Sequence, residues 1–578
     1  MSDQRVLATE FEMLAALMEV AGQNAFKVAA VRRVARVLED FEGDLRAVAA
    51  EPGALESMDG VGKSSASKIR QWCDDGTIAE LDTLRGEIPA GLVPLLDVSG
   101  LGPKTVGRLW READVTDHAS LRAAIDDGRL AALPRMGAKT IANILDSLNF
   151  AAQSADRTSI GRALPMAESL AEDLRSVDGV HRVEWAGSLR RGCETIGDID
   201  LLATTSEPAR LMERLTRRPD VTKVLASGDT KASVRLEAGI QVDLRVVDRE
   251  AFGAALLYFT GSKEHNVALR HAANTRGMRL NEYGLFKDDG DETPPQDRGM
   301  SPLASVTEAD IYQALDLPWH PPELRESHDS LDAAPPDLID QGDIRCDLHT
   351  HTTASDGHLS IADMAREAIA RGYHTLAITD HSKSSVQAGG LDEQRLRSHI
   401  DDIRAVDASL SEIRLLAGAE VDIHADGRLD YDDDLLAELD IVLAAPHVSL
   451  RQSPKDATKR LVAAVSHPLI HILVHPTGRI IGRRPGLEPD MDALVAAAAE
   501  HGTALEINAN PQRLDLRDRH VRKALAAGAR ITINTDAHAA AHFDFMRYGV
   551  VTGRRGGLTA KSCINAYSAS ELMDWLDR

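Results

Sequence analysis

Residues 346–351 read CDLHTH, a short run that ends in a pair of histidines. Six further runs, mostly apolar, each end in a residue that can bind a metal. They are residues 375–381 (TLAITDH), 415–420 (LLAGAE), 441–447 (IVLAAPH), 470–475 (IHILVH), 504–506 (ALE) and 530–538 (RITINTDAH). Helix-patterned segments separate most of the runs. In a β/α barrel, side chains from the carboxyl ends of different strands meet at one mouth. The pattern therefore predicts a barrel with a metal-dependent active site.

The types of ligand narrow the chemistry of this site. Histidine and carboxylate without cysteine favour Zn, Mn or Fe over a structural thiolate site. The candidates are too many for one ion, so two or three ions with bridging oxygens are expected. Clustered ions are common in phosphoester hydrolysis, where one forms hydroxide and another stabilises the leaving oxygen. The nine candidates are His349, His351, Asp356, His381, Glu420, His447, His475, Asp536 and His538.

The motifs HTHT, SDG, ITDHS, GAEVDI, PHVS, HPTGR and TDAH resemble the PHP (polymerase and histidinol phosphatase) family, over residues 342–578. The resemblance implies a distorted (β/α)7 barrel with up to three ions, either Mn²⁺ or Zn²⁺. The implied ligand sets are His349, His351, Glu420 and Asp536; Glu420, His447 and His475; and Asp356, His381 and His538. Arg479, Arg483 and Arg484 follow the His475 strand and are candidates to clamp a phosphate in a bidentate manner.

Length and composition limit the remaining possibilities. A chain of 578 residues is long enough for about four domains of ~150 residues. The net charge of −24 opposes DNA binding, but the acid gathers in segments such as residues 426–440. Four scattered cysteines without a CxxC motif favour a reducing compartment. No apolar run reaches the ~20 residues of a membrane span, and the N-terminus reads as an amphipathic helix, so a cytoplasmic protein is expected.

Gly-x-Gly turns lead into helices in the N-terminal part of the chain. The motifs are residues 59–69 (DGVGKSSASKI) and 99–109 (SGLGPKTVGRL), with an imperfect third copy at 133–145 (LPRMGAKTIANIL). This is the helix–hairpin–helix pattern, in which glycine permits a tight turn and the next helix offers free N–H groups to a phosphate. A plain turn between helices is the alternative. The predicted DNA contacts are Gly60, Gly62, Lys63, Gly100, Gly102 and Lys104.

A second group of carboxylates lies near the middle of the chain. Residues 185–202 (WAGSLRRGCETIGDIDLL) predict a strand, a Gly-Ser turn, a helix start and a strand that carries Asp198 and Asp200. Strand alternation puts these two carboxylates on one face. Asp243 lies in another alternating strand, at 240–247. Mg²⁺ favours a few carboxylates together with substrate phosphate oxygens, so we predict a site for two Mg²⁺ or Mn²⁺ ions.

GSLRR, GDIDLL, YFTGS (258–262) and LNEYGLF (280–286) resemble the palm and thumb of family X DNA polymerases, and the resemblance covers residues 1–317. It implies that Asp198, Asp200 and Asp243 are catalytic metal ligands, with Asp243 closest to a base for the primer 3′-hydroxyl. The implied nucleotide contacts are Gly187, Ser188, Arg190, Tyr258, Phe259, Gly261 and Asn266, with Arg270 facing the template. Gln241 stands where vertebrate gap-filling members carry arginine. Lys68 stands where they carry a Schiff-base lysine, and simple phosphate contact is its alternative role.

A polymerase joined to a PHP domain is the organisation of bacterial family X polymerases, which the whole chain resembles. The predicted fold is multidomain, α+β and α/β. The expected segments are an N-terminal helical domain (1–90), a fingers-like helical domain (91–152), a nucleotidyltransferase palm (153–250), a thumb (251–317), a linker rich in proline and acid (318–342) and the PHP barrel (343–578).

The predicted function is template-directed filling of short gaps during DNA repair, joined to a metal-dependent 3′–5′ exonuclease. The expected partners are dNTPs and gapped or 3′-recessed DNA, without a membrane, and we expect a monomer. One alternative is a nuclease that only clamps DNA with its N-terminal half. Another is a small-molecule phosphatase that uses the barrel alone.

Overall fold

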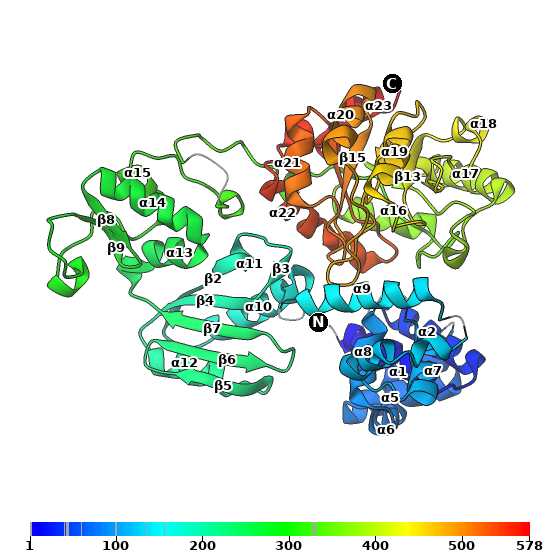
Figure 1. Cartoon of the computed structure of the whole chain (residues 1–578), viewed down its shortest axis with the longest axis horizontal. Helices are drawn as coiled ribbons and strands as arrows, with labels where there is room; N and C mark the ends of the chain where they lie inside the picture. Colours follow the sequence, from blue (N-terminus) through cyan, green and yellow to red (C-terminus); the bar gives the residue numbers. More distant parts are fainter. Residues whose placement is uncertain are drawn as a thin grey trace.

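The computed structural model describes residues 3–39, 41, 45–58, 60–98, 101–134, 136–154, 157–326 and 331–577. Along the chain come a helical region, a mixed sheet with its helices, a small helical and hairpin region, and a parallel barrel (Figure 1). This arrangement confirms the predicted multidomain α+β and α/β class. The predicted domain boundaries stay a prediction.

The N-terminal helices share one hydrophobic core, which runs from Leu7 to Leu148 among the described residues. Val61 and Leu101, the apolar residues between the paired glycines of two hairpin motifs, are both buried in it. The two predicted N-terminal segments therefore pack as one unit. The helices are α1 (Asp3–Val20), α2 (Ala25–Glu39), α3 (Leu45–Ala50), α4 (Ala54–Ser57), α5 (Lys63–Asp75), α6 (Ala79–Glu87), α7 (Pro103–Ala113), α8 (His118–Asp126) and α9 (Ala138–Ser154).

The middle sheet has the strand order β2-β4-β7-β6-β5 in the described part of the chain, and β4 and β7 are its parallel pair. Its strands are β2 (Val180–Trp185), β4 (Asp198–Thr205), β5 (Val221–Ser227), β6 (Lys231–Leu236) and β7 (Gln241–Val246). Helices α10 (Ile160–Arg175) and α12 (Pro208–Thr216) pack against it. Ile199 and Leu201 of β4 face the core beneath these helices. Alternation therefore turns Asp198 and Asp200 to the opposite face.

The region after this sheet is built on helices α13 (Phe252–Thr260), α14 (Lys263–Thr275) and α15 (Glu308–Ala314) and the hairpin β8 (Met278–Asn281) and β9 (Gly284–Lys287). Its core includes Leu257, Leu269 and Tyr312. The predicted linker is partly packed here. Leu324 is buried, and the Arg325 guanidinium donates to Glu308 from a fully buried position.

Seven parallel strands form the C-terminal sheet in chain order, among the residues described. They are β10 (Cys346–Asp347), β11 (Thr375–Ile378), β12 (Arg414–Asp422), β13 (Ile441–Ala445), β14 (Ile472–Leu473), β15 (Ala504–Asn508) and β16 (Ile531–Asn534). The bridge between Thr350 and Ala537 brings the first and last strands together. The sheet is thus a nearly closed barrel, which confirms the predicted (β/α)7 fold.

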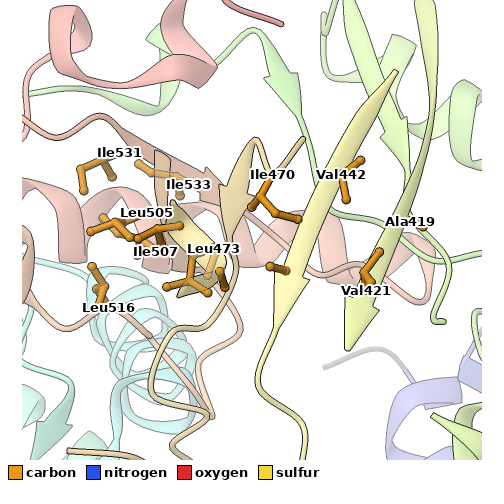
Figure 2. Packing of buried hydrophobic residues seen from close by; sticks show 14 of the residues in the cluster. Ala419, Val421, Val442, Ile470, Leu473, Leu505, Ile507, Leu516, Ile531 and Ile533 are labelled. Atoms are coloured by element: carbon orange, nitrogen blue, oxygen red, sulfur yellow. The ribbon is translucent and has the colours of Figure 1, made fainter. Parts of the chain in front are cut away.

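Alternation along the barrel strands separates the core from the site. Ala419 and Val421 of β12 belong to the cluster between strands and helices, part of which Figure 2 shows along consecutive strands. Glu420 and Asp422 therefore point into the barrel. The surrounding helices are α16 (Ile361–Ala370), α17 (Glu393–Asp407), α18 (Asp433–Leu436), α19 (Pro454–Val465), α20 (Met491–His501), α21 (Asp518–Ala526), α22 (Met546–Arg555) and α23 (Ala569–Leu576).

The barrel packs directly on the middle sheet region. Leu514 and Tyr548 of the barrel belong to the core cluster of that region. A Cβ on Gly192 would lie 2.2 Å from Val551 of α22, so the two surfaces are in close contact. Helix α9 runs beneath the barrel in Figure 1, where Arg451 donates to Asn143.

Candidate metal centres and active sites

The carboxyl ends of the barrel strands bring the nine predicted ligands to one mouth. Glu420 lies at its centre: its Oε1 is 2.7 Å from His475 Nε2 and 3.1 Å from His447 Nε2, and its Oε2 is 2.7 Å from His381 Nδ1. The close groups in the described chain are His351, Asp356, His381 and His538; His349, His351 and Asp536; His349, Glu420 and His475; and His381, Glu420 and His447. These groups overlap the implied ligand sets, but His381 lies with Glu420 as well as with Asp356.

The polar atoms at this mouth fit bound cations. Within the described residues, buried side-chain atoms here lack hydrogen-bond geometry to any partner: His349 Nε2, both ring nitrogens of His351, His381 Nδ1, Glu420 Oε2 and His475 Nδ1. Buried polar atoms normally find a partner because leaving them unpaired costs about 1–3 kcal/mol. Imidazole and carboxylate donors aimed at shared points are the donor set of Zn²⁺ or Mn²⁺.

Two further carboxylates contact the Nδ1 atoms of two ligand histidines. His349 Nδ1 lies 2.8 Å from Glu506 Oε1, and His447 Nδ1 lies 3.0 Å from Asp422 Oδ1. Such contacts fix the tautomer and ring orientation of a ligating histidine. Neither carboxylate was among the predicted metal ligands. For Asp422 the signal was its position two residues after Glu420, on the same face of β12.

The electrostatics and backbone of the mouth are unusual. Burial lowers the pKa of His351 to about 4, and the imidazoles of His538 and His381 act in the same direction. Burial alone would raise the pKa of Glu420, yet the surrounding imidazoles, His447 first, hold it well below its usual range. His475 and Asp536 have φ of 28° and 54°. Strained backbone at non-glycine residues is typical of functional sites.

The second carboxylate cluster forms where β4 and β7 run parallel. Asp200 lies opposite Asp243 in the strand register, and Asp198, Asp200 and Asp243 offer oxygens within 4.8 Å of one another. Burial, followed by the charges of Asp198 and Asp243, raises the pKa of Asp200 to about 7. A divalent cation relieves such repulsion between carboxylates.

Neighbouring residues shape this cluster. A Cβ on Gly187 would lie 2.3 Å from Asp200 Oδ2, so this position requires glycine because a carboxylate approaches it. Gln241 Nε2 donates to Asp243 Oδ2 at 3.0 Å, and the Ser233 hydroxyl donates to Asp243 Oδ1. The sequence singled out Gln241 only as a departure from relatives, and it missed Ser233, which faces Asp243 across the β6–β7 pair.

Arg190, a predicted triphosphate ligand, joins two regions of the structure. Its guanidinium donates to Glu308 at 2.7 and 2.8 Å and to the Thr260 hydroxyl at 2.6 Å. Arg325 donates to the same carboxylate from the other side. Ser188, in the short helix α11 (Gly187–Arg190), is half-buried beside it.

The other predicted nucleotide residues gather at the end of α13 and the start of α14. Tyr258 and Phe259 meet edge to face with ring centroids 5.1 Å apart, and Gly261 caps α13. Asn266 donates to the Tyr258 carbonyl at 2.7 Å. Tyr258, Asn266 and Arg270 line one small pocket, so the structure brings these three together.

Helices begin at two of the hairpin motifs, as predicted. Gly62 and Gly102 cap α5 and α7, and Lys63 is the exposed first residue of α5. Gly60 has φ of 85°. Lys104 is also exposed, with its amine 3.9 Å from Glu19. Gly100 lies outside the described residues.

Lys68 has two polar partners. Its amine lies 2.9 Å from Ser64 Oγ and 3.0 Å from Glu80 Oε2. The amine is therefore engaged by its own chain, whereas Schiff-base chemistry needs it to reach the abasic sugar.

The three arginines after β14 differ in their burial and in their contacts. Arg479 is buried and donates to Glu194 Oε2 of the middle region at 2.7 Å, so it joins the barrel to that region. Arg484 donates to the Gly478 carbonyl, and burial lowers its pKa to about 10. Arg483 is exposed.

An acidic trio on a nucleotidyltransferase-like sheet and a histidine-rich barrel mouth in one chain define a class of protein: a phosphoryl-transfer enzyme with two metal centres. Residues 255–326 match the DNA polymerase beta thumb and residues 347–510 the PHP domain. Residues 3–78 match a helix-hairpin-helix domain and residues 93–149 a SAM-like helix-hairpin-helix tandem.

Among proteins of known name, the chain is 41% identical over 573 residues to "DNA polymerase/3'-5' exonuclease PolX" of Bacillus subtilis, an alignment that covers 98% of both chains. The chain therefore belongs to the bacterial family X DNA polymerases that carry a PHP domain. It is 26% identical to rat DNA polymerase lambda over 47% of this chain and 48% of the relative. It is 30% identical to a probable phosphatase of Caldanaerobacter subterraneus over 35% of this chain and 78% of the relative.

Proposed function

We propose that this enzyme extends a DNA primer at the middle sheet, the palm, and removes nucleotides from a DNA 3′ end at the barrel mouth. It is a DNA-directed DNA polymerase and 3′–5′ exonuclease. The observation that carries the proposal is the presence of both complete ligand clusters in a chain that aligns with its Bacillus relative over nearly its whole length.

At the palm, Asp198, Asp200 and Asp243 would hold two divalent ions, which when bound neutralise charge on the transferring phosphate. The sequence and the preferences of hard cations favour Mg²⁺ or Mn²⁺. Asp243, which accepts from Gln241 and Ser233, would be the base closest to the primer 3′-hydroxyl. Gly187 admits Asp200 close to the start of α11, whose backbone N–H groups would be available to the phosphates of an incoming nucleotide.

At the barrel, the nine ligands would hold up to three ions, which when bound activate water and stabilise the leaving oxygen. Imidazole-rich ligand sets favour Mn²⁺ or Zn²⁺ over Mg²⁺. Glu506 and Asp422 orient His349 and His447, so the chain supplies both the ligands and their alignment. We expect Mn²⁺ to support exonuclease activity better than Mg²⁺ does.

We propose that the substrate is gapped or 3′-recessed DNA. The enzyme, acting as a monomer, would fill the gap with dNTPs during repair. Among the described residues no side chain caps the N-terminal ends of α5 and α7, so these ends, beside Lys63 and Lys104, suit sequence-independent contact with DNA phosphates. Such contacts need few cations, which reconciles DNA binding with the net charge of −24. Among the described helices none is long and apolar enough to cross a membrane. The expected cytoplasmic location stays a prediction.

A small-molecule phosphatase is the second candidate, because several relatives of the barrel are named probable phosphatases. Each aligns with only about a third of this chain, such as the 35% covered by the Caldanaerobacter protein. The acidic trio, the palm and the hairpin motifs have no role in such an enzyme.

One assay separates these functions. The protein is given a labelled primer in a one-nucleotide gap, a single-stranded oligonucleotide, and p-nitrophenyl phosphate as a small phosphomonoester. We expect template-matched incorporation in the gap and stepwise 3′ shortening of the single strand, with slower phosphomonoester hydrolysis. Fast phosphomonoester hydrolysis without incorporation would replace the proposal by the phosphatase.

The lyase role of Lys68 is tested separately. Borohydride trapping on DNA with a 5′-deoxyribose phosphate, for the wild type and Lys68→Ala, reports a Schiff base directly. Because Glu80 pairs with Lys68, we expect no adduct with the wild type. We expect Lys68→Ala to bind gapped DNA more weakly. A covalent adduct that Lys68→Ala abolishes would assign lyase chemistry to this residue instead.

A further inference from the structure

A large open groove lies where the palm, the start of α10, the helical region and the barrel meet. Its volume is about 1070 Å³. The palm contributes Thr195, Gly197, Asp198, Arg235 and residues 238–241 to its lining, and the barrel contributes residues 480–483, Pro511 and Gln512. The groove belongs to neither metal cluster alone, and it touches the surroundings of both.

The palm end of the groove reaches the polymerase site. Asp198 lies in its wall, beside Gln241, whose amide donates to Asp243. Arg157 is also in the wall. Its Nη1 lies 3.6 Å from where a Cβ on Gly197 would be, next to Asp198.

The barrel end is lined by two loops that lie beside the proposed exonuclease site. Pro511 and Gln512 directly precede Arg513, whose Nε is 3.9 Å from Asp536 Oδ2. Residues 480–483 belong to the loop after His475. The groove thus connects the surroundings of two active sites whose substrates share one chemical feature, a DNA 3′ end.

The charge of the wall is opposite to that of the molecule. Arg157, Arg162, Arg235 and Arg483 line the groove, and Asp198 is its one lining carboxylate among the described residues. Arg157 and Arg235 are held by neutral oxygens, at Thr195 and Gly239. Arg157, Arg162 and Arg235 form no ion pair within the described chain. In a protein of net charge −24, these three arginines without an ion pair in the described chain indicate an anionic ligand.

Size and chemistry select the form of that ligand. At about 1070 Å³ the groove is slightly larger than the roughly 300–1,000 Å³ of a pocket for one small ligand, which suits a short single-stranded segment. The described lining contains one aromatic ring, that of His118, so the contacts would go to phosphates more than to stacked bases. Guanidinium groups suit phosphates because they donate in a bidentate manner.

We propose that this groove binds the unpaired 3′-terminal segment of the primer as it passes from the palm to the barrel. The inference rests on the two activities proposed above and adds a binding site that joins them. Arg162 and Arg235 contact the phosphodiester backbone without reading its sequence. A mismatched primer end would then reach the barrel without leaving the protein.

The first test measures transfer within one binding event. The full-length enzyme is bound to a primer with a mismatched 3′ end, and reaction is started with Mn²⁺ and excess heparin, which traps enzyme that dissociates. The fraction of primer shortened is divided by the rate of the same variant on single-stranded DNA. We expect the double variant Arg162→Ala, Arg235→Ala to lower this ratio about five- to tenfold, and Arg217→Ala, an exposed arginine directly after α12, to leave it unchanged. An unchanged ratio in the double variant overturns the proposal.

The second test needs neither activity, so it separates failure of the groove from failure of the proposed function. Binding of a fluorescent eight-nucleotide oligothymidine is measured in EDTA at several salt concentrations. Loss of two phosphate contacts lowers the slope of log K against log salt by about 1.4 for a single strand. We expect that change for the double variant and none for Arg217→Ala. Equal slopes for the wild type and the double variant overturn the proposal whatever activities the enzyme shows.

Discussion

Glu506 illustrates which residues a sequence reveals and which need a structure. Eight of the nine metal ligands stand at or just after strand ends in recognisable motifs, so their convergence was predictable from strand polarity, and Asp356 follows in the loop after β10. Glu506 also ends an apolar run. Its contact with His349 Nδ1, however, depends on the register in which β15 pairs with β16, and on the position of β10 in the barrel. The same holds for Ser233, whose partnership with Asp243 is set by the pairing of β6 with β7.

Replacing Glu506 tests its orienting role at the residue scale. Because such supporting contacts are worth about 10–100-fold in metal affinity or activity, we expect Glu506→Gln to lower exonuclease activity within that range. Metal content per chain, measured by mass spectrometry after dialysis, is expected to fall as well, while nucleotide incorporation is retained. Glu500→Gln, an exposed glutamate of α20, is the matched control. Full metal content and exonuclease activity in Glu506→Gln would contradict this role.

At the scale of elements, the barrel strands and their order were predictable because each of these strands ends in a distinctive motif. Contacts between elements were not. The sequence placed Arg190 on the triphosphate, yet the structure pairs it with Glu308 at the start of α15, together with Arg325 from the predicted linker. Charge complementarity between residues more than a hundred positions apart leaves no local pattern. Likewise, the proline- and acid-rich composition of the linker did not indicate that part of it packs on the thumb.

The Glu308 carboxylate ties α11, α15 and the linker together, and its pKa gives a pH test. Burial opposes ionisation, but Arg190 and Arg325 lower the pKa of Glu308 to about 2. Because the folded pKa lies below the ordinary value of 4.5, this stabilisation is present above about pH 4.5 and is lost as the pH falls towards 2. Glu308→Gln leaves two arginines without their carboxylate, so we expect a loss of about 3–5 kcal/mol at neutral pH.

Thermal melts of the wild type and Glu308→Gln between pH 3 and 7 measure this difference. The gap in melting temperature is expected to be widest above pH 4.5 and to narrow as the pH is lowered. Glu292→Gln, an exposed loop glutamate, serves as the control. A gap that does not depend on pH would contradict the assigned ion pairs.

On the scale of the whole molecule, the palm and barrel form one packed body. Arg555 of α22 donates to the Arg191 carbonyl at 2.7 Å and reaches Glu326 and Asp518 at 3.1 and 2.7 Å. Sequence motifs gave the order of the parts but not this contact, since its residues carry no motif.

Arg555→Ala tests this packing. Truncating one member of a largely buried charge network at an interface costs about 2–5 kcal/mol. We therefore expect faster tryptic cleavage between palm and barrel and a larger radius of gyration by X-ray scattering. Arg217→Ala, whose side chain is 80% exposed, controls for loss of charge. An unchanged radius and cleavage rate in Arg555→Ala would show that other contacts hold the two parts.

The central claim is that one chain carries two independent metal-dependent sites, and a pair of variants tests it most directly. Asp200→Ala and His351→Ala are assayed for nucleotide incorporation in gapped DNA and for 3′–5′ degradation of single-stranded DNA, after thermal melts verify folding. Losing a catalytic metal ligand removes several kcal/mol of charge stabilisation, a rate effect of at least about a hundredfold. We predict that Asp200→Ala loses incorporation and keeps degradation, and that His351→Ala does the reverse. Loss of both activities in either folded variant would contradict the account.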